Sequence, residues 1–511
     1  MRALTKSEPE LEGLPQDWNI VELGDLLDRM ANGLTCKQEK EPPGIPVSRI
    51  ETISAGVIDF DRVRYVRDID DTKKEKFLLQ QGDLLFSHIN SDMHLGKTAV
   101  VTSSKPLLHG MNLLVLRTKK GLLDPYYLHY LMNHFRFSGE FISIAQHAVN
   151  QSSLNQKKIG SLKIPLAPIE QQRAIVAEIE KQFSRLDEAV ANLKRVKANL
   201  KRYKAAVLKA AVEGKLTEEW RKAHPDVEPA SKLLDRILAE RRAKWEEAEL
   251  ARMEAKGKAP KNDKWKEKYK EPAEPDITNL PKLPEGWVWA TVESLSRKVT
   301  DGVHKKPSYV TEGIPFVTVK NLTAGDGISF EDLNYVTPED HAEFCKRTHP
   351  ERGDILISKD GTLGVVRLIE TDRVFSIFVS VALVKPVSYD LSRYLVTAFE
   401  SSVVQRQMVP KGSGLQHIHL EDLRADCIPV PPLAEQYRIV AEVDCYLSLI
   451  RETETQVNIN LQRTERLRQS ILSRAFTGHL CPAEETEESL SDVPNLLDMV
   501  AESRAGYRGE K

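Results

Sequence analysis

The chain has 511 residues, of which 41% are hydrophobic and 29% charged, and its formal net charge is −2. This length predicts several domains, and the near-zero net charge excludes a chain that is basic throughout. No apolar run approaches the ~18 residues of a membrane span, and five scattered cysteines without a C-x-x-C pair favour reduced thiols over disulfides or a zinc site, so we expect a cytoplasmic protein.

The sequence contains one ordered set of motifs twice. The pairs are "LPQDW" at Leu14 and "LPEGW" at Leu283, "GDLLFS" at Gly82 and "GDILIS" at Gly353, "PLAPIEQQRAIVAEI" at Pro165 and "PVPPLAEQYRIVAEV" at Pro429, and "LKAAVEGKL" at Leu208 and "LSRAFTGHL" at Leu472. A unit of this length that occurs twice indicates a duplicated module, because solenoids are built from more and shorter repeats.

In chain order, each copy is a globular part followed by a long helix. We expect an N-terminal tail over 1–13, domains over 14–163 and 283–427, long helices over 164–216 and 428–480, a charged and partly helical linker over 217–282, and an acidic tail over 481–511. Short runs rich in Val, Ile and Leu between turn residues predict mixed α/β domains with mainly antiparallel sheets, and hence an α+β fold. Most of the linker is expected to be a solvated connector.

Both long helices carry capping and packing signals. Pro168 and Pro432 suit a first turn, and Gly214 and Gly478 suit C-terminal caps. Apolar spacings of three and four predict a coiled-coil-like stripe on each helix, which consists of Ile179, Phe183, Leu186, Val190, Leu193 and Leu200 in the first and of Val443, Leu447, Ile450, Val457, Leu467 and Ile471 in the second.

Two stripes of equal length most economically bury each other. The second is interrupted by Glu454, Asn460 and Thr464. The chain can return in either direction; we favour antiparallel pairing, which places two similar domains at opposite ends of a rod with pseudo-twofold symmetry. A dimerisation coiled coil without further purpose is the alternative.

Three segments differ between the copies: "TCKQEKEPP" against "VHKKPSYVTE", "HINSDMH" against "KDGT", and "AVNQSSLNQ" against "PKGSGLQHIH". They carry side chains that bond to base edges and phosphates, although polar loops are also common on solvated surfaces. Candidate DNA contacts in and near them are Lys37, Arg49, His88, Asn90, Gln151, Ser152, Asn155, Lys305, Lys306, Lys320, Lys359, Lys411, Ser413, Gln416 and His417. From Asn192 to Val212 the first helix is basic without an acid, which adds Lys194, Lys197 and Lys201.

Motifs for catalysis are weak. "LGKT" at Leu95 imitates a phosphate-binding loop, but the required glycine is Ser91, and "LGVV" at Leu363 lacks the lysine. "HIH" at His417 has no further ligand cluster beside it. Amino-methylation, dinucleotide-binding and nuclease motifs are not found, so we expect neither a catalytic nor a metal site.

The doubled motifs, taken together in register, resemble the specificity subunits of type I restriction-modification enzymes. The resemblance implies that 14–163 and 283–427 are target recognition domains, each reading one half of a bipartite, asymmetric DNA site. It also implies that the helices pack antiparallel as a spacer and as a platform for two methyltransferase subunits, which restriction/translocase subunits then join. Catalysis, with S-adenosylmethionine, ATP and Mg, is expected in those partners, and no cofactor in this chain. A coiled-coil scaffold that does not touch DNA is the alternative.

Overall fold

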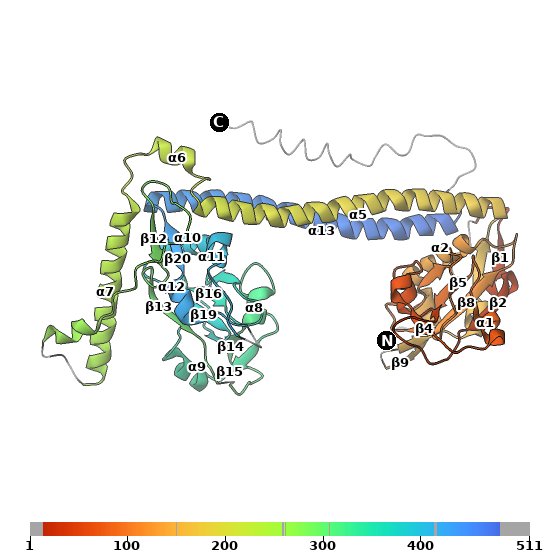
Figure 1. The fold of residues 1–511 in the computed structure, drawn as a ribbon, viewed down its shortest axis with the longest axis horizontal. Coiled ribbons are helices and arrows are strands. Elements are labelled where there is room, and N and C mark those ends of the chain that lie inside the picture. Colours follow the sequence, from red (N-terminus) through yellow and green to blue (C-terminus); the bar gives the residue numbers. More distant parts are fainter. Residues whose placement is uncertain are drawn as a thin grey trace, which may run out of the picture. The chain divides into compact units, whose positions relative to one another are not determined.

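The computed structural model describes residues 14–149, 151–257, 260, 262–305, 307–412 and 416–480 (Figure 1). The chain divides into two compact units, Met1–Leu193 with Asn458–Lys511, and Lys194–Val457. Each unit contains one predicted domain and a part of both long helices. The tails over 1–13 and 481–511 lie outside the described residues.

The first unit has an α+β domain. Its strands are β1 (Asn19–Glu22), β2 (Leu27–Asn32), β3 (Ile45–Val47), β4 (Arg64–Val66), β5 (Leu84–Ser87), β6 (Ile89–Asn90), β7 (Thr98–Val100), β8 (Leu113–Thr118), β9 (Gln146–Ala148), β10 (Gln151–Ser153) and β11 (Lys163–Leu166). Its helices are η1 (Leu23–Leu26), η2 (Glu51–Ile53), η3 (Phe60–Arg62), α1 (Asp71–Phe77), α2 (Pro125–Ser138), α3 (Glu140–Ile144) and α4 (Gln156–Gly160).

The second unit repeats this plan. Its strands are β12 (Val288–Thr291), β13 (Ser296–Asp301), β14 (Ile314–Val317), β15 (Asn334–Val336), β16 (Ile355–Ser358), β17 (Val366–Leu368), β18 (Ser376–Ile377), β19 (Val381–Pro386) and β20 (Cys427–Val430). Its helices are α6 (Glu218–Ala223), α7 (Ala230–Ala255), η4 (Asp263–Lys268), α8 (Val319–Thr323), α9 (Pro338–Cys345), α10 (Tyr389–Glu400), α11 (Ser402–Gln405) and α12 (Leu420–Ala425).

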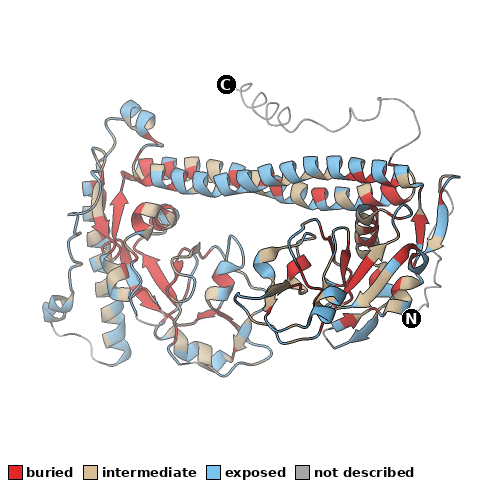
Figure 2. Cartoon of the chain, turned by 45° about the vertical axis from the view of Figure 1, so that its right-hand side comes forward, coloured by how far each residue is buried: buried red, intermediate tan, exposed pale blue. Residues whose placement is uncertain are grey.

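A four-stranded antiparallel sheet forms the centre of each domain. Its order is β2-β8-β5-β7 in the first and β13-β19-β16-β17 in the second. Alternate side chains of a central strand enter different hydrophobic clusters, as Ile357 does on one face and Leu356 on the other. Both faces of the sheet are therefore buried (Figure 2). The prediction of mainly antiparallel sheets is confirmed; β14 and β18 form the parallel exception among the pairs between named strands.

The two long helices are α5 (Ile169–Val212) and α13 (Leu433–Phe476), each of 44 residues. The predicted cap glycines adopt left-handed backbone conformations, with φ of 70° at Gly214 and 79° at Gly478. In the first unit the Arg468 guanidinium of α13 lies 4.8 Å from the Phe183 ring of α5. In the second unit the rings of Tyr203 and Tyr446 are 6.3 Å apart. The beginning of each helix thus lies beside the end of the other within a unit.

The predicted stripes are buried to different degrees. Ile179, Leu193, Val443, Ile450 and Val457 are buried, whereas Phe183, Leu186, Val190, Leu200, Leu447 and Ile471 are half-buried. Leu467, which the spacing placed in the stripe, is 42% exposed. Of the interrupting residues, Thr464 is buried and its hydroxyl donates to the carbonyl of Asn460, so the helix itself satisfies this polar group.

The tryptophan of each L-P-x-x-W motif is tied to the first turn of a long helix. Trp18 Nε1 donates to Gln171 Oε1 at 2.8 Å, and Trp287 Nε1 donates to Glu435 Oε2 at 2.8 Å. Gln171 and Glu435 occupy the same position of the repeated helix motif. The two motifs therefore recur together because they form one joint between domain and helix.

Two further bonds of this joint also occur in both units. The hydroxyl of Tyr127 donates to the Pro165 carbonyl, and that of Tyr394 to the Pro429 carbonyl. The next glutamine of each helix, Gln172 or Gln436, donates to a backbone carbonyl before the helix begins. These bonds fix the direction in which each helix leaves its domain.

The linker is more than the expected solvated connector. Leu233 and Ile237 of α7 are buried in the core of the second unit. Arg241 donates to the carbonyls of Glu293 and Ser296, and Lys244 to that of Val387. The helix is thus a packed layer of the second domain.

Substitution of Glu435 tests the joint. Its carboxylate is buried and accepts hydrogen bonds from Thr217, Arg221 and Trp287. Glu435→Ala leaves these donors unpaired and should destabilise the second unit by about 3 kcal/mol, seen as a lower melting temperature of the full chain. The exposed Glu285→Ala is the control and should change stability by less than ~0.5 kcal/mol. Equal melting temperatures for both variants would contradict the assignment.

Candidate functional site

Two of the three divergent segments meet in the first domain. Strand β6 pairs with β10, and β10 with β9, in one small sheet. The Leu154 N–H donates to the His88 carbonyl at 2.8 Å, which attaches this sheet to the end of the central strand β5. Of the predicted contacts, His88, Asn90, Gln151 and Ser152 are therefore neighbours.

A polar network connects this small sheet to the loop that follows β6. The Ser152 hydroxyl bonds to Asp92, and His147 Nδ1 lies 2.8 Å from the same hydroxyl. Ser152 and His88 are almost fully buried, and burial lowers the pKa of His88 to about 4, so that its ring is neutral at pH 7. These two residues support the loops, whereas Gln151 and Asn155 are exposed.

The third divergent segment of the first domain lies beside β3 and β4. Lys37 is exposed there. Arg49 donates to Gln38 Oε1 at 3.0 Å and to Glu51 Oε1 at 2.8 Å. Lys97 of "LGKT" donates to the Ser54 carbonyl at 2.9 Å and so links the segment after β5 to the loop that follows Arg49.

All three divergent segments meet in the second domain. His417 forms β-bridges with Asp360 and Lys411. The Ile418 N–H donates to the Lys359 carbonyl at 2.9 Å, which is the equivalent of the Leu154 bond to His88. The same backbone connection therefore holds different loops in the two domains.

Asp301 is a buried junction at the base of these loops. Its carboxylate binds Arg347, lies 3.2 Å from His304 Nε2 and lies 3.3 Å from Lys359 Nζ. Burial raises the pKa of Asp301. Its bonds to Arg347, His304 and Lys359 lower this pKa by more than burial raises it, so that the net shift is downward. Lys359 is buried and holds the loops together.

The remaining predicted residues of the second domain are on its surface or outside the described ranges. Lys305 and Gln416 are exposed. Lys411 pairs with Asp422 at 2.7 Å, and Lys320 pairs with Asp332. Lys306 and Ser413 lie outside the described residues.

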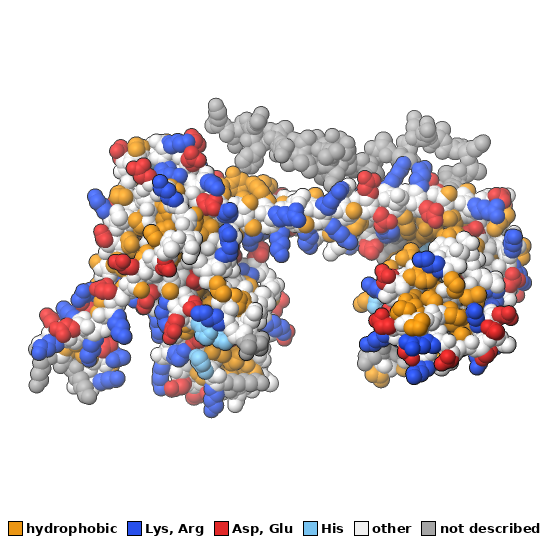
Figure 3. Space-filling model, viewed as in Figure 1, with side chains coloured by type: hydrophobic (Ala, Val, Ile, Leu, Met, Phe, Trp, Pro, Cys, Tyr) orange, Lys and Arg blue, Asp and Glu red, His pale blue; other side chains and the backbone are white. Residues whose placement is uncertain are grey.

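The basic run of α5 belongs to the second unit. Lys194, Lys197 and Lys201 are exposed, whereas Lys204 lies 3.9 Å from Glu400 and Lys209 lies 3.6 Å from Glu213. Figure 3 shows lysine and arginine side chains along the long helices. This half of α5 therefore presents positive charge to solvent.

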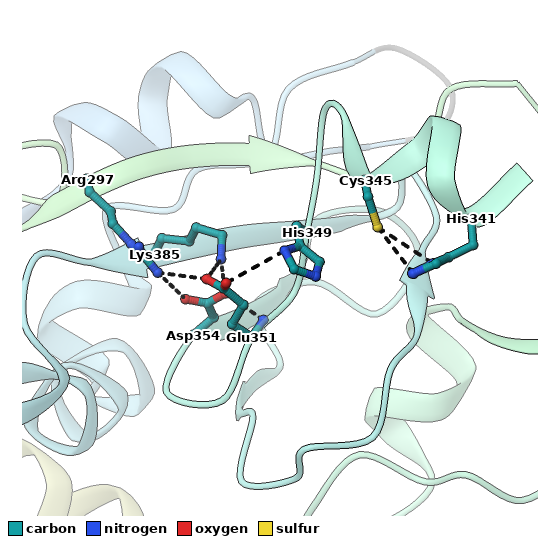
Figure 4. Close-up of polar contacts among 7 residues, drawn as sticks. All are labelled: Arg297, His341, Cys345, His349, Glu351, Asp354 and Lys385. Carbon is teal, nitrogen blue, oxygen red and sulfur yellow. Dashed lines mark hydrogen bonds and ion pairs between the residues drawn. The ribbon is translucent and has the colours of Figure 1, made fainter. Parts of the chain in front are cut away.

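A second charged group lies at one end of the central sheet of the second domain (Figure 4). Lys385 Nζ is 2.5 Å from Asp354 and 2.7 Å from Glu351, which also pairs with Arg297. The first domain has Arg117 bonded twice to Asp83 at the same strand positions. Because both copies contain this ion pair, it belongs to the common framework.

The nearby Cys345 thiol of the same view favours its protonated form. Cys345 Sγ lies 3.3 Å from His341 Nε2, and burial raises the pKa of this thiol. Within the described ranges, no three His, Cys, Asp or Glu side chains are placed to hold a metal ion. In the "HIH" motif, the imidazole rings of His417 and His419 have centroids 4.5 Å apart.

Comparison with known proteins agrees with this duplicated plan. Residues 15–202 and 284–463 match the family described as "Type I restriction modification DNA specificity domain". The chain belongs to this family.

Curated relatives support the membership. The chain is 42% identical over 223 residues, 41% of its length, to the putative type I restriction enzyme MjaX specificity subunit of Methanocaldococcus jannaschii, and it spans about half of that relative (52%). It is 22% identical over 484 residues to the type I restriction enzyme EcoAI specificity subunit of Escherichia coli, covering 84% of this chain and 77% of that one.

A solved structure shares the fold. It comes from work on "complex assembly and conformational transition of the type I R-M system", with a TM-score of 0.63, 18% identity, and coverage of 91% of this chain and 99% of that chain. No described helix is long and apolar enough to cross a membrane.

Sequence reasoning missed the residues that hold the loops. Asp92, His147 and Asp301 are not among the predicted contacts, although Asp301 ends β13 at the position where Asn32 ends β2. A carboxylate in one copy where the other has Asn32 was the available signal for a loop-specific role.

The buried carboxyl of Asp426, directly before β20, should make the stability of the protein depend on pH. Burial and then Asp422 raise the pKa of Asp426 to about 7, and its Oδ2 has no hydrogen-bond partner. The folded protein thus holds a proton that the unfolded chain releases near pH 4, so the contribution of Asp426 to stability is most favourable below pH 4 and becomes less favourable until about pH 7. Asp426→Asn should melt at a higher temperature than the parent protein by a margin that grows between pH 4 and 7. The exposed Asp235→Asn should show no such trend, and a constant margin for Asp426→Asn would refute the assignment.

Proposed function

We propose that this chain is the DNA sequence-specificity subunit of a type I restriction-modification complex, in which each domain reads one half of a bipartite, asymmetric site. The observation that carries the proposal is that one framework presents different loops at the same place in both domains. Two different reading surfaces are what an asymmetric site requires. The exposed loop residues Lys37, Gln151, Asn155, Lys305 and Gln416 are the first candidates for base contacts.

The long helices are proposed as an antiparallel coiled coil that relates the two domains by pseudo-twofold symmetry and sets the gap between half-sites. Support comes from each unit separately. The beginning of α5 packs beside the end of α13 in the first unit, and the end of α5 packs beside the beginning of α13 in the second. The basic half of α5 suits the phosphates of the spacer DNA.

Catalysis is proposed to lie in partner subunits. Two methyltransferase subunits would dock on the helices and use S-adenosylmethionine, and restriction/translocase subunits would use ATP and Mg. A scaffold that does not touch DNA would not need unlike loops on matching frameworks, which favours the recognition role.

Exchange of one domain tests the division of labour. Replacement of residues 14–163 by the corresponding domain of another family member should change one half of the methylated motif and leave the other half and the gap unchanged. Replacement of 283–427 is the reciprocal control. An unchanged motif, measured by modification-sensitive sequencing, would contradict the assignment.

Lengthening of both helices tests the spacer. Insertion of seven residues after Leu193 and after Val457 keeps the apolar stripe in register and adds about 10.5 Å, or about three base pairs. The gap should widen by that amount, or activity should be lost. The same insertion after Pro275 in the linker is the control and should leave the gap unchanged. A lengthened pair that retains both motif and activity would refute the spacer.

A further inference from the structure

Two apolar side chains are exposed on the loops of the small sheet in the first domain. Met93, in the loop after β6, is 77% exposed, and Val149, directly after β9, is 92% exposed. Single exposed apolar residues are normal on a protein surface. These two, however, lie in two of the segments that differ between the copies, and hairpin turns favour Asn, Asp and Gly over a β-branched residue. Their exposure therefore indicates a role other than folding.

The pairing of the strands brings both residues to one end of the small sheet. Val149 lies in the turn between β9 and β10. Strand β6 runs antiparallel to β10, so the chain after Asn90 continues toward this turn. The Asp92 carboxylate accepts a hydrogen bond from the Ser152 hydroxyl of β10, which holds the residue before Met93 against the hairpin. The loop after β6 and the turn of the hairpin thus form one tip.

The tip lies at the end of the domain opposite the joint with the long helix. Figure 1 shows β9 at the other end of the first domain from β1, and β1 pairs with β11, the strand that leads into α5. The Leu154 bond to His88 attaches the small sheet to the end of the central strand β5. A two-stranded ribbon in this position has the shape that enters the major groove of DNA, which is about 12 Å wide.

The residue types at the tip indicate which base pair it fits. Segments 91–94 and 149–152 contain no lysine or arginine, the side chains that most often read guanine. Gln151 is exposed beside Val149, and a glutamine amide bonds to both N6 and N7 of adenine. The thymine paired with that adenine presents a 5-methyl group, which is the apolar group of the major groove. An amide next to apolar side chains therefore matches an A·T pair.

We propose that Val149 and Met93 contact thymine 5-methyl groups in the major groove, so that the half-site read by the first domain contains an A·T pair at this tip. The inference rests on the proposed DNA-reading function and names a base pair that this function leaves open.

Replacement of thymine by uracil removes only the methyl group and so tests the contact directly. The full chain, in complex with its methyltransferase subunits, is titrated with a duplex that carries the methylated motif mapped by modification-sensitive sequencing. Further duplexes have deoxyuridine in place of one thymine at a time, in the half-site that the exchange of residues 14–163 assigns to the first domain. At one or two positions the parent complex should bind the uracil duplex roughly threefold to fivefold more weakly, as expected for the loss of one buried methyl group.

Removal of the two side chains should abolish this preference. Met93→Ala with Val149→Ala should bind the thymine duplex more weakly by about the same factor, and should bind thymine and uracil duplexes equally. Because both side chains are exposed, the variant should fold like the parent. Leu122→Ala removes an exposed apolar side chain outside the divergent segments and should retain the parent preference for thymine.

A first half-site without an A·T pair would overturn the proposal, and so would a parent complex that binds every uracil duplex as tightly as the thymine duplex. A retained preference for thymine in the Met93→Ala, Val149→Ala variant would assign the methyl contact to other residues. Weaker association of the methyltransferase subunits with an unchanged preference for thymine would assign the tip to that partner. Failure of the parent complex to bind the motif duplex would instead overturn the proposed function.

Discussion

In each domain, a hydrogen bond from a tryptophan to the first turn of a long helix is central to the joint between domain and helix. Trp18 with Gln171 and Trp287 with Glu435 are the two instances. Because the helix begins where the last strand of its domain ends, this bond and the tyrosine bond to the preceding carbonyl fix the angle between helix and domain. A reading surface is useful at a defined distance from another only if such joints are rigid, and the duplication explains why both joints are built alike.

The framework and the loops follow different physical rules. A buried ion pair, Asp83 with Arg117 or Asp354 with Lys385, recurs at the same end of the central sheet because removing either partner leaves a buried charge unpaired. The loops beyond β5 and β16 share only a backbone bond, from Leu154 to His88 or from Ile418 to Lys359. Backbone bonds do not restrict side-chain identity, so the domains diverge there without loss of the fold.

The sequence was sufficient for the parts that are governed by periodicity and capping. It predicted two long helices near their observed ends and mainly antiparallel domains. It was insufficient for burial in the loops, because His88, Ser152 and Lys359 were selected by residue type. The backbone turns these side chains inward, directly after a central strand for His88 and Lys359 and in the middle of β10 for Ser152. It also underestimated the linker, since the apolar face of α7 becomes core only through contact with strands that follow it in the chain. Asp301 was missed because only its difference from Asn32 in the other copy distinguishes it, and residue type does not show that this position is buried.

The central claim is that two unlike reading surfaces on matched frameworks specify one asymmetric, interrupted DNA site. Modification-sensitive sequencing of the source genome, with and without this gene, measures this most directly. The account predicts a methylated motif of two different parts separated by a fixed gap, which disappears when the gene is removed. A continuous or palindromic motif, or a methylation pattern that does not depend on the gene, would contradict it.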